Sequence, residues 1–194
     1  SKGSFTGDNK KYLRFWHEIS NRSKNWKMYN KAGGYRKWYG IASHLLNWAN
    51  DGKEVLEFKG SGFGIKKFFD KKHLVWSGLS SGPPSFRWDP DEWWFDDASP
   101  SIIDENLRFG TLGFLNSIVA RYMLNLINPT VNNQAGDVKK LPIADLGLKR
   151  NNIESNTEYC ITISKNDWDS RETSWDFEQS PFLNETNSIE NAYQ

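Results

Sequence analysis

The chain has 194 residues, of which 37% are hydrophobic and 15% aromatic, including 10 Trp. This length fits one domain or a domain with an appendage, and the aromatic content favours a folded core over a disordered chain. No apolar run is long enough to cross a membrane, no secretion signal is visible, and the single Cys160 allows no internal disulfide. These features argue against membrane-spanning and disulfide-rich secreted proteins and predict a cytoplasmic setting.

The net charge of +1 conceals a strong asymmetry along the chain. Residues 1–88 contain 17 Lys and Arg and 6 Asp and Glu, a balance of +11, whereas residues 89–194 contain 8 and 18, a balance of −10. Such a split predicts a basic half that faces an anion and an acidic half that faces solvent or a protein. The alternative is that the two halves mix in space and their fields cancel. The chain begins Ser-Lys, which suggests a piece of a larger protein.

The first predicted element is a short helix within residues 10–19, because Tyr12, Phe15, Trp16 and Ile19 recur at steps of three and four. Residues 41–59 are then expected to form two short strands around a turn at 50–52, since Asp-Gly between apolar runs is typical of hairpins.

A flexible basic loop is expected at residues 60–67. After it, residues 73–95 contain three strand-like runs, "HLVWSGL", "SFRWDP" and "EWWFDD", with a Gly-Pro-Pro turn between the first two. This part of the chain is therefore predicted to be rich in β-structure.

The clearest predicted helix covers residues 111–127, with an apolar face and a proline that ends it. That face consists of Leu112, Leu115, Val119, Tyr122 and Leu126.

The last part of the chain, residues 151–194, is acidic and rich in Asn and Ser, and Ser164 with Asp167 suggests the N-cap of a short helix. Together the elements predict an α+β fold: a β-rich domain at 1–150 with one long packed helix, then an acidic C-terminal extension at 151–194 leading toward a helical spacer.

Several motifs in the sequence resemble cofactor-binding or metal-binding sites, but each lacks a feature that such a site needs. The glycine-rich stretch Gly60–Gly64 lacks the preceding apolar strand that a cofactor loop needs. The three histidines are too far apart in sequence to match a metal-ligand spacing. The acidic run between Asp89 and Asp97 either holds a metal or forms an exposed turn, and its interleaved Trp residues favour the turn. We therefore assign no catalytic, cofactor-binding or metal-binding residue.

The segment Asn128-Pro129-Thr130-Val131 begins like the Asn-Pro-Pro-aromatic tetrad of adenine methyltransferases. In that tetrad the aromatic residue stacks on a flipped base, which a valine cannot do. The segment also follows a predicted helix, whereas the tetrad follows a strand. We interpret it as a helix terminator and turn.

Four sequence blocks nonetheless resemble one group of proteins. They are "FTGDNKKYLRFW", "MYNKAGGYRKWYG", "LGFLNSIVARYMLNLINPTVNNQAGDVKKLPI" and "DWDSRETSWDF". In this order they resemble blocks in the specificity regions of the PglX-like adenine-specific DNA methyltransferases of BREX phage-defence systems. They are more distantly similar to the TaqI-type C-terminal specificity domain of type II restriction-modification enzymes. The resemblance spans about residues 4–181.

This resemblance implies a target-recognition domain that binds duplex DNA so that a separate, upstream methyltransferase domain can methylate a flipped adenine. S-adenosylmethionine would be the cofactor of that parent enzyme. The cofactor loop and the base-holding tetrad are absent from this chain, so we expect the fragment to be inactive by itself. Other implied partners are proteins of the same bacterial defence system or a phage inhibitor.

Candidate DNA contacts follow from side-chain chemistry. Phosphates are contacted by basic groups, guanine is read by Arg, and adenine is read by Asn or Gln. The candidates are Asn9, Lys10, Lys11, Arg14, Arg36, Lys37, Lys66, Lys67, Ser80, Ser81 and Arg87, with Lys71 and Lys72 as further phosphate contacts. Three alternatives stay open: Arg36 forms only a structural cation–π pair, the Ser80–Gly82 loop is an ordinary hairpin, and Asp8 with Asn9 caps the following helix.

Two other functions remain open. One is a protein-interaction module in which residues 151–194 dock onto another protein. The other is a carbohydrate-binding module, suggested only by the many aromatic residues. The single cysteine and the missing secretion signal argue against the second.

Overall fold

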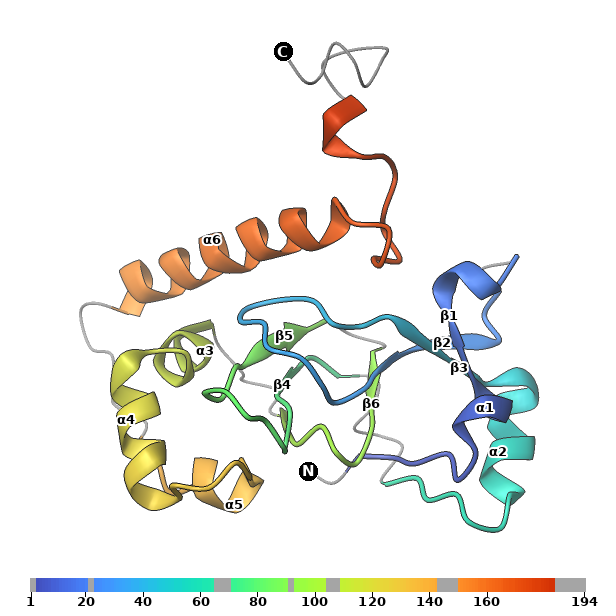
Figure 1. Cartoon of the computed structure of the whole chain (residues 1–194), viewed down its shortest axis with the longest axis horizontal. Coiled ribbons are helices and arrows are strands. Elements are labelled where there is room, and N and C mark those ends of the chain that lie inside the picture. The colour runs from blue at the N-terminus through green and yellow to red at the C-terminus, as the bar shows by residue number, and fades with distance from the viewer. Residues whose placement is uncertain are drawn as a thin grey trace.

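A computed structural model describes residues 3–20, 23–64, 71–90, 93–103, 109–142 and 150–183. It confirms an α+β fold with two β-sheets and helices grouped around them (Figure 1). Figure 1 shows the first sheet's outer strand with α1 and α2 at one end of the molecule and α3, α4 and α5 at the other. In Figure 1, the long helix α6 lies above α3 and extends toward β5.

The first sheet has the strand order β1-β3-β2-β6. Its strands are β1 (Leu13–Phe15), β3 (His44–Asn47), β2 (Trp26–Asn30) and β6 (Trp94–Phe95). The pairs β1–β3 and β2–β3 are antiparallel, and β2–β6 is parallel. Because Phe15 and Tyr29 both pair with His44, the end of β1, the end of β2 and the start of β3 meet at one end of this sheet.

Short helices flank the first sheet. They are α1 (Asn9–Tyr12), the 3-10 turns η1 (Trp16–Glu18) and η2 (Ala49–Gly52), and α2 (Lys53–Glu57). Asp8 caps α1 by accepting a hydrogen bond from the Lys11 amide at 3.0 Å, which confirms the capping interpretation of the Asp8-Asn9 pair. Buried aromatic and aliphatic residues form the core that packs against this sheet.

The second sheet is antiparallel, with the order β5 (Arg87–Asp89), β4 (His73–Val75) and β7 (Ser101–Ile103). The predicted strand-like runs of residues 73–95 thus correspond to β4, β5 and β6. A core that contains Trp76, Phe86, Leu112 and Ile161 joins this sheet to the helices. The helices are α3 (Phe109–Leu115), α4 (Ile118–Ile127), α5 (Ala135–Val138) and α6 (Arg150–Asp169), and a last 3-10 turn, η5, covers Pro181–Leu183.

Two expectations for the N-terminal half are wrong. The predicted helix within residues 10–19 is α-helical only to Tyr12, because residues 13–15 pair with β3 as strand β1 and a single 3-10 turn follows at Trp16–Glu18. The predicted second strand of the 41–59 hairpin is instead helix α2. The turn before it has positive φ at Asn50, Asp51 and Gly52, and this left-handed run directs the chain into a helix.

The predicted single helix 111–127 is two helices, and the side chain of Asn116 explains the break. Its amide exchanges two hydrogen bonds with the backbone of Phe86, at 2.9 and 3.1 Å. The backbone carbonyl of Asn116 accepts a hydrogen bond from Lys37 Nζ at 2.9 Å. The next residue, Ser117, caps α4 because its Oγ accepts a hydrogen bond from the Ala120 amide. The break rotates α4, so Ala120 and Leu124 are its buried residues.

As a consequence, the second half of the predicted apolar face is exposed. Val119, Tyr122 and Leu126 face solvent, although Leu112 and Leu115 are buried as predicted. The Asn128–Thr130 segment ends α4 in a turn in which Asn128 donates to the Asp137 carboxylate at 2.7 Å. This confirms the interpretation of Asn-Pro-Thr as a terminator and turn.

The acidic C-terminal extension contains a helix of 20 residues, longer than expected. Ser164 does not cap it but lies inside it, with its hydroxyl 3.1 Å from both the Lys37 and the Tyr39 carbonyl oxygens. The buried residues Thr157, Ile161 and Ser164 form the contact face of α6. The assignment of 1–150 as a separate DNA-recognition domain stays a prediction, and α6 packs directly against its core.

Candidate nucleic-acid interface

The predicted DNA-binding residues divide into those engaged inside the protein and those on its surface. Arg36 belongs to the first group. Its Nε donates to the Tyr39 carbonyl at 2.8 Å, and its Nη2 donates to the Ser164 carbonyl and the Asp167 carboxylate, both at 2.7 Å. The guanidinium also lies 5.4 Å from the ring centre of Trp168. Arg36 therefore clamps α6 onto the 36–40 loop.

Lys37 and Lys11 are also engaged. Lys37 donates to the Asn116 carbonyl, as described above. Lys11 Nζ lies 2.6 Å from Glu54 Oε1, and this hydrogen bond raises the pKa of Lys11. Because Glu54 already neutralises Lys11 locally, this lysine contributes less to a positive surface than its exposure suggests.

Arg87 is fully buried beside a polar cluster between the two sheets. In this cluster the Asp89 carboxylate accepts a hydrogen bond from Asn30 at 2.7 Å and lies 3.2 Å from His73 Nε2. Among the described residues, no acceptor lies within hydrogen-bond distance of the Arg87 guanidinium. Burial lowers the pKa of Arg87, and the charge of Asp89 acts in the opposite direction. In this conformation Arg87 presents no group to DNA.

The predicted serine loop lies near the turn that follows α4. The Ser80 amide donates to the Val131 carbonyl at 3.0 Å, and the Ser80 hydroxyl accepts from the Gly82 amide at 3.2 Å. Ser81 is exposed at the tip. Lys66 and Lys67 lie outside the described residues, and Lys72 is exposed immediately before β4. The loop is thus held at its base and open at its tip, far along the chain from α1.

Three predicted residues do come together, at the end of the first sheet where β1, β2 and β3 meet. Asn9, Lys10 and Arg14 line a cavity of about 540 Å³ there. Lys31 and His44, which were not predicted, line it too, and Leu13, Phe15 and Glu18 complete the wall. We call this the basic cavity.

The donors of the basic cavity are only partly used. The side-chain amino groups of Lys10 and Lys31 make no hydrogen bond or ion pair with the described residues. Arg14 uses one guanidinium nitrogen, Nη1, to bind the carbonyls of Lys10 at 2.6 Å and Leu13 at 2.7 Å, which leaves its other nitrogens available. The carboxylate of Glu18 accepts a hydrogen bond from the Phe15 amide at 2.7 Å. The cavity therefore offers cationic donors to an anion.

The positive charge of the basic cavity affects the pKa of His44. Burial lowers the pKa of His44 below its usual value of 6.5, the charge of Lys31 lowers it further, and Glu18 opposes both. At neutral pH the ring is therefore uncharged, with Nδ1 at 3.2 Å from the Ser43 hydroxyl. Sequence reasoning missed Lys31 and His44 because only the register of β1, β3 and β2 brings them next to Arg14.

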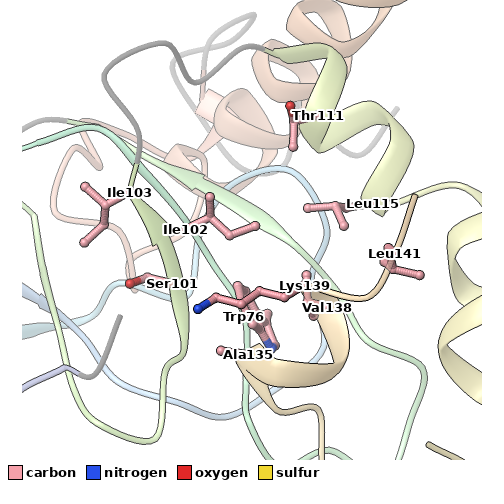
Figure 2. A pocket seen from close by; sticks show the side chains of 10 residues that line it. All are labelled: Trp76, Ser101, Ile102, Ile103, Thr111, Leu115, Ala135, Val138, Lys139 and Leu141. Carbon is pink, nitrogen blue, oxygen red and sulfur yellow. The ribbon is translucent and has the colours of Figure 1, made fainter. Parts of the chain in front are cut away.

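A second cavity, of about 480 Å³, has a different character (Figure 2). Its walls are mostly apolar and come from β7, α3 and α5, and Figure 2 shows the Lys139 side chain reaching across it. Its lining residues are Trp76, Ser101, Ile102, Ile103, Thr111, Leu115, Ala135, Val138, Lys139 and Leu141. With one cationic group among apolar walls, it offers little to a polyanion.

Neither a metal cluster nor a membrane span is found in the part of the chain that the structure describes. No group of three or more His, Cys, Asp or Glu side chains there is placed to hold a metal ion. Within the same ranges, no helix combines the length and the apolar composition needed to cross a membrane. Two members of the acidic run considered as a metal site, Asp91 and Glu92, lie outside the described residues.

No protein-family model matches the chain. Two curated proteins are similar to it over most of its length. Adenine-specific methyltransferase PglX of Lacticaseibacillus casei (strain Zhang) is 33% identical over 198 residues, which cover 91% of this chain and 16% of that protein. Adenine-specific methyltransferase BrxX of Escherichia coli O9:H4 (strain HS) is 30% identical over 194 residues, which cover 94% and 16%. The chain thus spans about one sixth of the length of these relatives.

Proposed function

Because the chain is homologous to one segment of PglX-like adenine-specific methyltransferases, we propose that it is a DNA-recognition domain of such an enzyme. In the full-length protein, a separate methyltransferase domain would transfer a methyl group from S-adenosylmethionine to an adenine flipped out of the duplex. This chain would hold the duplex and select its sequence. The setting would be the bacterial cytoplasm, in a BREX-type phage-defence or restriction-modification system.

The basic cavity is the single structural observation that carries this proposal. It brings Lys10 and Arg14, from consecutive elements, next to Lys31, which follows β2, at one end of a sheet, and their donors are only partly used by the protein itself. Phosphate contacts from such groups supply most of the affinity of proteins for DNA. Asn9, whose side chain is exposed beside them, is the candidate for an adenine contact, and its Oδ1 already accepts from Thr6 at 2.8 Å.

The test is fluorescence anisotropy of the 194-residue chain with a random duplex across a salt series. We expect a linear decrease of log K with log salt, whose slope is about 0.9 for each phosphate contact. The double variant Lys10→Gln/Lys31→Gln removes two proposed contacts, so its slope should be smaller by about 1.8.

The matched control removes two positive charges elsewhere. Arg121 and Lys139 are exposed on α4 and directly after α5, and Arg121→Gln/Lys139→Gln should leave the slope unchanged. An equal decrease in both variants would show that total charge matters and not the basic cavity. Absence of any binding at low salt would reject the DNA-recognition function for this chain.

A protein-interaction module is a second candidate, favoured by one observation on the acidic helix α6. Tyr159 and Ile163 lie one turn apart and are 66% and 51% exposed. Other defence proteins or a phage inhibitor are the proposed partners. Deleting residues 151–194 is a poor test, because Ile161 of α6 is part of the core. Tyr159→Ser/Ile163→Ser keeps the buried face and should abolish partner binding without affecting DNA binding.

A further inference from the structure

A third cavity lies beside the basic cavity, between η1 and the segment that follows α6. Its volume is about 560 Å³. Aromatic rings supply most of its lining, with Ser43, Glu172 and Thr173 as the polar members; the rings belong to Phe15, Trp16, His17 and Phe177. We call this the aromatic cavity.

Phe15 joins the two cavities because its side chain lines both of them. It is 43% exposed although it is a large apolar ring. The ring is stacked on His17, with centres 5.5 Å apart and planes 4° apart, and lies 4.6 Å from the ring of His44. Phe15 therefore packs between two imidazole rings and separates a cationic site from an aromatic one.

We propose that the aromatic cavity binds an unpaired nucleobase while the basic cavity binds the phosphate next to it. This inference rests on the proposed DNA-binding function and adds a specific ligand to it. A nucleotide combines an aromatic base with an anionic phosphate a few bonds away, which matches the order of the two cavities around Phe15. A base inside a duplex shows only its edge, so stacking on these rings requires a base that has left the helix or belongs to a single strand.

The polar members of the aromatic cavity define a preference among bases. A carboxylate accepts hydrogen bonds but does not donate them, so Glu172 suits an exocyclic amino group, which adenine, cytosine and guanine carry. Thymine has no amino group and offers only its ring N3–H between two carbonyls that a carboxylate repels. The hydroxyl groups of Ser43 and Thr173 can donate or accept and do not discriminate. The bound base is therefore expected to carry an amino group.

The experiment compares two DNA duplexes of the same sequence, one fully paired and one with a single unpaired adenine, by anisotropy with the 194-residue chain. We expect the bulged duplex to bind more tightly. Phe15→Leu keeps an apolar side chain but removes the ring, so it should weaken binding of the bulged duplex by about fivefold to 150-fold, the range of base–aromatic stacking. The ratio of the affinity for the bulged duplex to that for the paired duplex should therefore decrease, because the paired duplex offers no free base to the ring.

Two controls make the result specific. Tyr35 is an exposed aromatic residue outside both cavities, and Tyr35→Leu should change neither affinity. Glu172→Gln should reduce the preference for an unpaired adenine over an unpaired thymine.

Equal binding of bulged and paired duplexes by the unaltered chain would overturn the aromatic site but leave DNA recognition standing. If neither duplex binds, the proposed function fails together with this inference. Saturable binding of tetramethylammonium at the aromatic cavity, with no preference for the bulge, would assign the cavity to a cation and also overturn it.

Discussion

Replacing Arg36 by Ala should destabilise the protein strongly, because this side chain holds α6 against the rest of the molecule. The change removes two hydrogen bonds to backbone carbonyls, of Tyr39 and Ser164, and one ion pair with Asp167. Hydrogen bonds from a charged donor contribute about 1.5 kcal/mol each at the low end of their range, which applies because the guanidinium is partly exposed, and a partly exposed ion pair contributes less than about 1 kcal/mol. We therefore expect a loss of about 3 kcal/mol in the free energy of unfolding.

The assay is urea denaturation followed by far-ultraviolet circular dichroism, together with a thermal melt. For a chain of this size, 3 kcal/mol corresponds to a decrease of about 6–12 °C in Tm. Arg171→Ala is the matched control, because Arg171 pairs with the same Asp167 at 3.1 Å but is 58% exposed. That variant should cost less than about 0.5 kcal/mol.

The same pair of variants decides between the two roles considered for Arg36. If Arg36→Ala destabilises no more than Arg171→Ala, the clamp is unimportant and the reasoning from buried hydrogen bonds fails. If stability is unchanged but sequence preference on DNA is lost, Arg36 reads a base. A large loss of stability with unchanged DNA preference in the folded variant establishes the structural role.

Three further results are expected. Asn116→Ala leaves the buried Phe86 amide without its hydrogen-bond partner, while the Phe86 carbonyl keeps the hydrogen bond from the Trp38 amide at 2.9 Å. The variant should cost about 1–3 kcal/mol in urea denaturation. Lys31→Gln should raise the pKa of His44 measured by NMR. Because that pKa lies below 6.5 in the folded protein, His44 should lower stability as pH falls through 6.5, and the variant should reduce this loss. Gly136 lies in α5, and no atom lies within 4 Å of the methyl group that Gly136→Ala would add. The variant should therefore increase the free energy of unfolding by about 0.5–1 kcal/mol, which a thermal melt would show as a higher Tm.

The sequence predicted strand-like runs separated by turn residues and a helix end marked by proline. The three strand-like runs between His73 and Phe95 became β4, β5 and β6, and the turn at Asn128 ended a helix. It did not predict that helix 111–127 breaks, because the break depends on Asn116 binding the backbone of Phe86, 30 residues earlier. Local periodicity carries no information about such a distant partner.

Helix α6 was underestimated for a related reason. Its buried face consists of Thr157, Ile161 and Ser164, and two of these three are polar. A stripe of this kind gives no clear apolar period, so the sequence favoured only a short helix. A side chain on Gly113 of α3 would clash with Thr157, so the two helices pack closely through small residues in place of large apolar ones.

The candidate site was predicted in part. Asn9, Lys10 and Arg14 are close in sequence and remain together in the basic cavity. Lys31 and His44 join them only through strand pairing, and Phe15 was expected on a helix face, where it would have been buried. Charge composition alone therefore identified the half of the chain that contains the site but not the arrangement of its residues.

The sequence blocks that carry the resemblance to methyltransferases contact one another in the folded protein. The Arg36–Gly40 block contacts Asp167 and Trp168 of the last block, and Asn116 receives a hydrogen bond from Lys37. A domain can retain these contacts between blocks and still change the residues that line its cavities. We infer that the sequence identity of 30–33% to the two relatives reflects a shared fold held by these contacts. Under the proposed function, the DNA sequence recognised would depend on the side chains around Phe15. Exchange of these residues between relatives should then transfer the DNA preference while the contacts between the blocks stay intact.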